Sequence, residues 1–114
     1  MPCRQGEVVL VPFPFTNLQA TKQRPAVVVS ADWFNRTRAD CVLVAVTSQV
    51  PARIERDQLA LSATDLMSAG LPKASIVSLG KLVTLHQSTI IKTLGTLPSA
   101  TLTRVLEGVH DVCG

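Results

Sequence analysis

The chain has 114 residues, enough for one compact domain with its own core and too few for two domains of ordinary size. Hydrophobic residues make up 46% of it and charged residues 17%, proportions that argue against an intrinsically disordered chain. The net charge of +3 arises in residues 1–56, where seven Lys and Arg face four Asp and Glu; a polyanionic partner is compatible with this bias but not established by it.

Two strands are predicted in the N-terminal quarter. Glu7 to Phe15 begins with the β-branched run V-V-L-V, which is typical of a buried strand, and ends in P-F-P-F. Pro12 and Pro14 oppose its continuation as a central strand. A polar loop, Thr16 to Gln23, comes next, and a second strand over Ala26 to Ser30 is entered through Arg-Pro.

The middle of the chain predicts four short elements. They are a helical turn within Asp32 to Asp40, a buried strand over Cys41 to Thr47, a weaker strand over Gln58 to Leu61, and a short helix from Ser62 through Met67. Ser62 is a suitable N-cap for that helix, and Gly70 is suited to closing it.

Three further strands are predicted before the last helix. Ser75 to Leu79 and Leu82 to Leu85 read as two separate short strands around Gly80, and Thr89 to Leu97 contains another.

The C-terminal segment predicts an amphipathic helix. Ser99 follows Pro98 and is suited to the N-cap. Apolar residues recur on one face at the i, i+3, i+4, i+7 spacing: Leu102, Val105, Leu106, Val109 and Val112. Several short strands and one terminal helix indicate a mainly β protein with helices, of the α+β class, built as a small, strongly bent antiparallel sheet or barrel. We expect residues 1–114 to form a single domain.

The cysteines and the N-terminus suggest a cellular compartment. Cys3, Cys41 and Cys113 are odd in number and widely spaced, with no C-x-x-C pair or neighbouring His, so neither a zinc site nor a disulfide framework is expected. The start M-P-C-R-Q-G lacks an apolar signal core, and no run of about 18 apolar residues could span a bilayer. We therefore expect a cytoplasmic protein without a membrane association.

Several common catalytic plans have no support in the sequence. His86 and His110 are the only histidines, and His110 lies at the edge of the predicted C-terminal helix, which disfavours a two-histidine acid–base pair. There is no Gly-rich phosphate loop, no G-x-S-x-G motif and no carboxylate cluster with metal-ligand spacing.

Polar residues at two strand boundaries offer a different chemistry. Arg24 opens the second predicted strand, and Thr47-Ser48-Gln49 closes the third. These are also ordinary residues for strand ends, a solvated charge and a β-former. An RNA 2′-hydroxyl can nevertheless attack its own adjacent phosphate, so a protein need only align the groups and stabilise the charge on phosphorus. An Arg fork fits phosphate oxygens bidentately, a Thr hydroxyl can hold a third oxygen, and the scheme needs no metal and no cofactor.

Three sequence blocks resemble one protein family. G-E-V-V-L-V-P-F-P-F-T-N-L from Gly6, K-Q-R-P-A-V-V-V-S from Lys22 and V-A-V-T-S-Q from Val44 are similar, in order and spacing, to the leading blocks of the MazF/PemK family of toxin endoribonucleases. The likeness continues more loosely through K-L-V-T-L to the C-terminal helix. It implies an SH3-like barrel, a homodimer, a cognate antitoxin protein, and metal-independent, sequence-selective cleavage of single-stranded mRNA to 2′,3′-cyclic phosphate and 5′-hydroxyl ends.

The resemblance also assigns roles to residues. Arg24 matches the family's catalytic arginine, which stabilises the phosphate transition state, and Thr47 matches the hydroxyl residue beside it. An RNA groove is expected between loops Thr16 to Gln23 and Ser48 to Asp57. Phe13 and Phe15 at the loop entrance are the candidate aromatic platforms for bases, and core packing is the expected alternative for at least one of them. The expected RNA-binding residues are Phe15, Thr16, Asn17, Lys22, Gln23, Ser48, Gln49, Arg53, Arg56 and Lys81.

Two departures from the family pattern leave the general base open. Many relatives carry an acidic residue in the loop that corresponds to Thr16 to Gln23, which here has none. Some carry acidic residues where this chain has Ser78-Leu-Gly80. The base is water, a group in another loop, or His86.

Two other function classes compete with the nuclease. A protein-binding toxin of the CcdB kind, which poisons DNA gyrase, would share the fold but has no use for a phosphate clamp at strand ends. An RNA- or partner-binding module with degenerate catalysis would account for the missing acidic residues.

Overall fold

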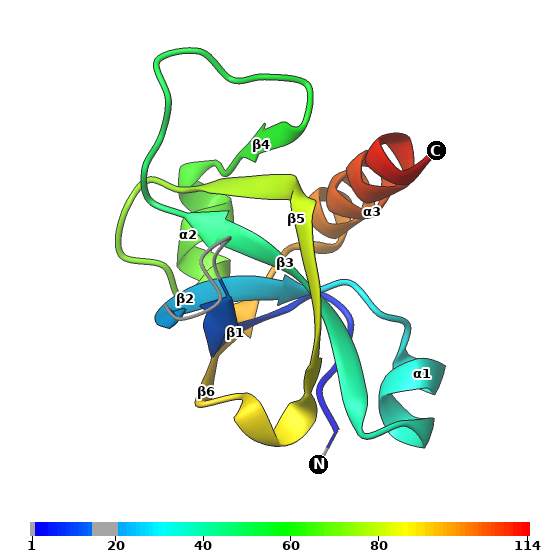
Figure 1. The fold of residues 1–114 in the computed structure, drawn as a ribbon. Coiled ribbons are helices and arrows are strands. Elements are labelled where there is room, and N and C mark those ends of the chain that lie inside the picture. The colour runs from blue at the N-terminus through cyan, green and yellow to red at the C-terminus, as the bar shows by residue number, and fades with distance from the viewer. Residues whose placement is uncertain (1, 15–20) are drawn as a thin grey trace.

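The structure is a computed structural model that describes residues 2–14 and 21–114. In this part of the chain one antiparallel sheet has the strand order β4-β5-β3-β2-β1-β6 and curls into a half-barrel (Figure 1). Its strands are β1 (Glu7–Pro14), β2 (Thr21–Val28), β3 (Asp40–Thr47), β4 (Gln58–Ala60), β5 (Ile76–His86) and β6 (Lys92–Thr96). The helices are α1 (Asp32–Thr37), α2 (Ala63–Ala69) and α3 (Ser99–Cys113), with a 3-10 turn η1 (Gln87–Thr89). The prediction of an α+β fold with a bent antiparallel sheet and a C-terminal helix is confirmed.

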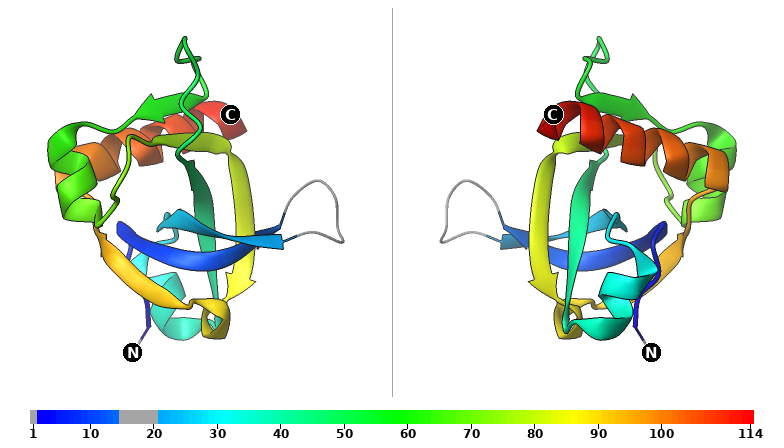
Figure 2. Two further views of the ribbon diagram at one scale, coloured as in Figure 1. Left: turned by 90° about the vertical axis from the view of Figure 1, so that its left-hand side faces the viewer. Right: turned by 90° about the vertical axis from the view of Figure 1, so that its right-hand side faces the viewer.

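The helices lie at opposite ends of the curled sheet. Figure 2 shows α1 beside the N-terminus at one end, and α3 with the C-terminus at the other. α3 packs on β5, α2 packs on β6, and α1 contacts β3. The predicted elements in the middle of the chain, α1, β3, β4 and α2, are all present within a residue or two of the expected bounds.

Alternation along the strands divides the core between the two faces of the sheet. The cluster that receives α2 and α3 consists of Val8, Val27, Val44, Val46, Ala69, Leu71, Val77, Leu79, Leu97 and Val105. The cluster on the opposite face consists of Val9, Val11, Phe13, Ala26, Val28, Cys41, Leu43 and Ala45. The small residues Ala26 and Ala45 of the second cluster pair with each other, and Ala45 forms part of the floor of the candidate site.

Strand β1 continues through both prolines that were expected to limit it. Leu10 accepts a hydrogen bond from the Ile91 amide at 2.8 Å, so its backbone polar groups face β6. Pro12 and Pro14 lie two and four residues after Leu10, so their backbone groups point to the same side of β1 as those of Leu10. Strand β6 pairs with β1 only as far as Leu10. The missing N–H groups therefore point away from β2, and pairing with β2 extends to Pro14.

Strand β2 begins earlier than predicted. It starts at Thr21 rather than Ala26, because the polar segment T-K-Q-R pairs with the end of β1 in a hairpin. Only residues 26–28 of β2 also pair with β3, so the polar part extends beyond its neighbour. Arg24 thus lies within a strand, opposite Val11, and does not open one.

Strand β5 is a single strand of 11 residues and not the two short strands predicted around Gly80. The register shifts between Val44, which pairs with Leu82, and Ala45, which pairs with Ser78. The extra residues on β5 bend it sharply, as Figure 1 shows, without interrupting it. One strand can therefore pair with both halves of β3.

The two larger helices end as their sequences require, with one correction. Ser62 and Asp65 form a reciprocal capping box at the start of α2, and Gly70 ends it with φ of 71°. The N-cap of α3 is Pro98, so Ser99 is the first helical residue and does not cap the helix. Gly108 allows α3 to approach β5, since a Cβ there would lie 2.5 Å from Leu79 Cδ1.

Candidate active site

Sheet register brings the two predicted catalytic residues together. Ala26 of β2 pairs with Ala45 of β3, and Arg24 and Thr47 each lie two residues beyond that pair, in the same direction because the strands are antiparallel. Residues two apart on a strand share a face. Arg24 and Thr47 therefore project from neighbouring strands on the same face of the sheet.

A cleft of about 720 Å³ opens over this face. Four residues of the predicted site line it: Arg24, Thr47, Gln49 and Lys81. Its other lining residues are Phe13, Pro14, Ala45, Val46, Pro51, Asp57, Gln58, Ile76, Ser78, Gly80 and Leu82. The cleft thus combines an apolar wall with a few polar groups from β2, β3, β5 and the loop before β4, as ligand sites commonly do.

The side chain of Thr47 is held in place by its own backbone. Its Oγ1 accepts a hydrogen bond from the Gln49 amide at 3.1 Å, a local turn contact that fixes the hydroxyl at the end of β3. The hydroxyl has one proton to donate as well as lone pairs to accept with. Thr47 is half-buried, and so is Arg24 on the neighbouring strand.

Besides Gln58, which begins β4, two polar residues of the cleft were not singled out from the sequence. Ser78 pairs with Ala45 on one side and with Gln58 on the other, so it stands on the same row of the sheet as the floor of the site. Asp57 immediately precedes β4, and its carbonyl accepts a hydrogen bond from the Leu79 amide at 2.9 Å. Because both positions depend on the pairing of β4 with β5, no local sequence motif marks them.

The remaining predicted RNA-binding residues either do not line the cleft or lie outside the described residues. Ser48 is exposed just after β3, and Lys22 and Gln23 are exposed on β2. Arg53 is exposed in the loop before β4, 3.9 Å from Glu55. Three others lie outside the described residues: Phe15, Thr16 and Asn17.

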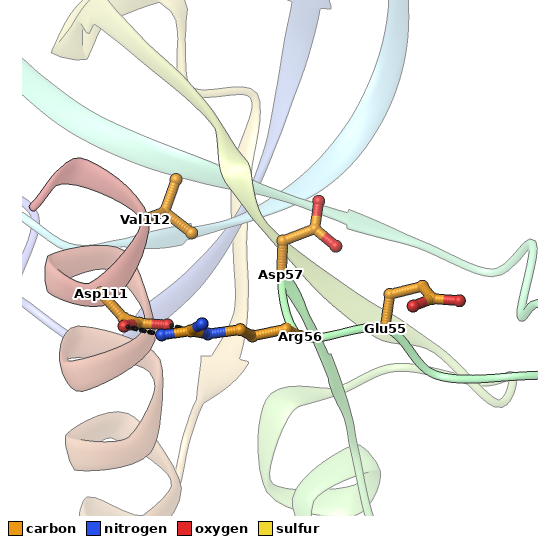
Figure 3. Close-up of a pocket in the computed structure, with 5 residues that line it drawn as sticks. All are labelled: Glu55, Arg56, Asp57, Asp111 and Val112. Carbon is orange, nitrogen blue, oxygen red and sulfur yellow. Dashed lines mark hydrogen bonds and ion pairs between the residues drawn. The ribbon is translucent and has the colours of Figure 1, made fainter.

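Arg56 has a partner within the chain. Its Nε and one terminal nitrogen donate to the Asp111 carboxylate of α3 at 2.9 and 2.8 Å (Figure 3). The pair lines a separate pocket of about 550 Å³ together with Glu55, Asp57 and Val112. The hydrogen bonds and charge of Arg56 hold the pKa of Asp111 below its ordinary value, and Asp111 in turn raises the pKa of Arg56. This bidentate pair ties the loop before β4 to α3.

His86 stands apart from the cleft. It ends β5, opposite Asp40, and its Nδ1 accepts a hydrogen bond from the Ser88 amide at 3.1 Å. The nearest residue of β5 that lines the cleft is Leu82, four residues or about 13 Å away along the strand. His86 of this chain is therefore not placed to act at the site.

A family model matches nearly the whole chain. The model of the PemK-like, MazF-like toxin of type II toxin-antitoxin systems matches residues 4–113. The chain belongs to this family. Two relatives, endoribonuclease MazF2 of Mycobacterium bovis and endoribonuclease MazF6 of Mycobacterium tuberculosis, are each 29% identical over 100 residues, which are 87% of this chain and 85% of theirs.

Solved structures share the fold. A mycobacterial endoribonuclease in complex with its cognate antitoxin matches with a TM-score of 0.77 and 21% identity, covering 98% of this chain and 95% of that one. MazF from Deinococcus radiodurans matches with a TM-score of 0.78 and 20% identity, covering 100% and 98%. The half-barrel with its C-terminal helix is therefore a MazF-like fold.

Two features are absent from the part of the chain that the structure describes. Within 2–14 and 21–114, no three His, Cys, Asp or Glu side chains are grouped so that they could hold a metal ion. Within the same part of the chain, no helix is long and apolar enough to cross a membrane.

Proposed function

We propose that this chain is the endoribonuclease toxin of a toxin–antitoxin pair and that it cleaves single-stranded mRNA at short preferred sequences without a metal ion. The observation that carries the proposal is the register of β2 and β3, which places Arg24 and Thr47 on one face at the mouth of a shared cleft. The endoribonuclease relatives and the family membership support the same activity.

The chemistry follows from the geometry of these two side chains. The 2′-hydroxyl gives its proton to a base, which is water or a group in another loop, as its oxygen attacks the adjacent phosphorus. The bond from phosphorus to the 5′-oxygen breaks and that oxygen takes up a proton, leaving a 2′,3′-cyclic phosphate and a 5′-hydroxyl. Arg24 offers a planar fork to two non-bridging oxygens, where negative charge accumulates. Thr47 donates its remaining proton to the phosphate group, and its fixed position orients the group for in-line attack.

RNA is held by groups around this centre. Gln49 and Lys81 line the cleft together with Arg24 and Thr47, and we assign them contacts to the RNA there. We assign further RNA contacts to the other predicted residues: Phe15, Thr16, Asn17, Lys22, Gln23, Ser48, Arg53 and Arg56. We expect Arg56 to contribute least to them, since Asp111 already binds its guanidinium.

We further propose that the protein acts as a homodimer in the cytoplasm and that a cognate antitoxin holds it inactive. The solved relatives with a bound antitoxin support the partner. Mixing the protein with its antitoxin should abolish cleavage at a fixed ratio of the two chains.

Incubation of the purified protein with a mixed-sequence RNA in excess EDTA tests the activity. We expect cleavage that leaves 2′,3′-cyclic phosphate and 5′-hydroxyl ends, and we expect a single 2′-deoxy substitution at the cut site to abolish it. Arg24→Ala protein prepared in parallel controls for a contaminating ribonuclease. A strict requirement for added divalent metal would overturn the mechanism, and inhibition of DNA gyrase without RNA cleavage would favour the protein-binding class of toxin.

A further inference from the structure

A row of paired residues crosses four strands beneath the cleft and locates Asp57 relative to the proposed cut. Ala26 pairs with Ala45, Ala45 with Ser78, and Ser78 with Gln58. Neighbouring strands lie about 4.8 Å apart, so Gln58 is about 10 Å from Ala45 across the sheet. Asp57 therefore stands on the far wall of the cleft from Arg24.

Asp57 and Thr47 lie on opposite sides of that row. Thr47 is level with Ile76 and Ala60, whereas Asp57 precedes Ala60 by three residues, or about 10 Å along the strand. A carboxylate at this distance is placed to meet a nucleotide that flanks the cut, and not the phosphate that Arg24 and Thr47 hold.

The backbone around Asp57 is fixed at both ends. The Asp57 carbonyl accepts from the Leu79 amide at 2.9 Å, and the Gln58 amide donates to the Glu55 carbonyl at 3.0 Å. The Gln58 side chain also accepts from the Glu55 amide at 2.9 Å. The loop thus enters β4 through three hydrogen bonds, which gives the Asp57 side chain a defined origin.

The neighbouring arginine does not neutralise this carboxylate. Figure 3 shows the Arg56 guanidinium reaching Asp111 on α3, while the Asp57 carboxylate points away from that pair. Among the described residues, the ion pairs are those of Arg53 with Glu55 and of Arg56 with Asp111, and neither includes Asp57. The cleft therefore contains a negative group that repels phosphate, and such a group binds RNA through hydrogen-bond donors, namely the N–H groups of a base or a ribose 2′-hydroxyl.

We propose that Asp57 reads a nucleobase with two adjacent N–H donors, namely guanine, at a nucleotide flanking the cut. This assignment rests on the proposed function in that it treats the cleft as an RNA site. Two carboxylate oxygens accept in parallel from guanine N1–H and N2–H, because these donors are neighbours on its Watson–Crick edge. The corresponding edges of adenine, cytosine and uracil place an acceptor beside each donor, which the carboxylate repels. Unstacked bases of single-stranded RNA expose this edge.

Binding, measured without cleavage, tests the assignment. The probes are short 2′-O-methyl RNA oligonucleotides that differ at one position, which carries guanine, inosine or adenine, and that position is moved along the oligonucleotide. Inosine lacks only the N2 amino group. At one position we expect the wild-type protein to bind guanine about tenfold more tightly than inosine, and adenine more weakly still, as loss of a base contact in a bidentate pair predicts. Asp57→Asn should lower the ratio of guanine to inosine affinity to about one.

Glu55→Gln is the matched control. It removes a carboxylate two residues away that lies outside the cleft, so the guanine preference should persist. Equal affinities for guanine and inosine at every position in the wild type, or no binding of any oligonucleotide, would overturn the assignment. It would also be overturned if Asp57→Asn kept the guanine preference.

Cleavage by the same variants separates this proposal from the proposed function. If the oligonucleotides bind with a guanine preference while natural RNA stays intact, the assignment of Asp57 to base recognition is supported and the proposed ribonuclease activity is wrong. If Asp57→Asn instead slows cleavage of all RNAs equally, removes the acidic limb of the pH–rate profile and leaves base preference unchanged, Asp57 is the general base and the present proposal is wrong.

Discussion

Two regions of this molecule each contain an aspartate and a threonine but use them for different purposes. On the helical side, Asp65 is buried and accepts hydrogen bonds from the Ser62 amide at 2.9 Å and from the Thr101 hydroxyl at 2.5 Å. In the cleft, Asp57 and Thr47 face an open space of about 720 Å³. A carboxylate and a threonine thus hold α2 and α3 together in one region and line a ligand site in the other.

This difference shows that the hydrogen-bonding partners of a side chain indicate its role better than its residue type does. The Thr101 proton is used by Asp65, whereas Thr47 uses a lone pair for the Gln49 amide and has a proton to give. Changes in the cleft should therefore lower the rate of RNA cleavage and leave the fold intact. Changes on the helical side should lower stability and leave the cleavage rate of the folded protein unchanged.

The largest effect is expected from Arg24→Lys. Lysine keeps the positive charge but loses the two-pronged donor, so cleavage should slow by on the order of 10²–10³, or roughly 3–4 kcal/mol of transition-state stabilisation. Single-turnover rates, with circular dichroism to verify folding, measure this. Arg24→Ala should be only slightly worse, and a rate near that of the wild type for Arg24→Lys would rule out the bidentate clamp.

Thr47→Val should have a smaller effect in the same direction. Valine preserves the β-branched shape and deletes the hydroxyl, so the expected loss is about tenfold in rate, as for one neutral hydrogen bond. Thr84→Val is the matched control, because Thr84 is exposed on β5 outside the cleft. Equal rates for the two variants would mean that the Thr47 hydroxyl does not touch the reacting group.

Asp65→Asn should change stability and not rate. Burial favours the neutral acid, but hydrogen bonds from Thr101 and Ser62, with the nearby charge of Arg104, outweigh it and lower the pKa of Asp65. A lowered pKa in the folded state adds stability above the pKa of the unfolded chain, and this stability is lost as pH falls through the folded value. At pH 7 the variant should therefore lose about 1–3 kcal/mol of unfolding free energy.

Urea denaturation at pH 7 and near pH 2.5 measures that change. The difference between Asp65→Asn and the wild type should shrink as pH is lowered, because proton uptake by the wild-type carboxyl removes the same charge. A difference in unfolding free energy that stays constant with pH would mean that the charge of Asp65 contributes nothing to stability. A large loss of cleavage by the folded variant would mean that the helical side also contributes to activity.

The parts of the fold that were predictable are those that local patterns determine. The β-branched run of β3, the capping box of α2 and the apolar stripe of α3 each appear in the sequence at the right spacing. The polar start of β2 was missed because pairing with β1 outweighs its composition. The continuity of β5 was missed because Gly80 marks a shift in pairing with β3, which only the partner strand reveals.

The candidate site divides in the same way. Arg24 and Thr47 were predicted because they lie in sequence blocks that resemble a known family, and the register of β2 and β3 explains why they lie on one face. Asp57 was not identified because its place in the cleft depends on β4 pairing with β5. The ion pair of Arg56 could not be foreseen, since Asp111 lies 55 residues away in the chain.

The smallest effect concerns how two cations contribute to RNA binding. Lys22 is exposed on β2, whereas Arg56 is bound to Asp111. Each phosphate neutralised by a protein cation adds about 0.7 to the slope of log affinity against log salt concentration for single strands. Lys22→Gln should therefore reduce this slope by about 0.7, while Arg56→Gln should leave it nearly unchanged, because the charge it removes is already balanced within the protein.

Asp111→Asn supplies the converse, since it frees Arg56 and should steepen the slope. Titrations of a 2′-O-methyl RNA at several salt concentrations measure all three. If Arg56→Gln flattens the slope as much as Lys22→Gln does, then RNA displaces Asp111 on binding, and the loop before β4 detaches from α3 whenever the cleft is filled.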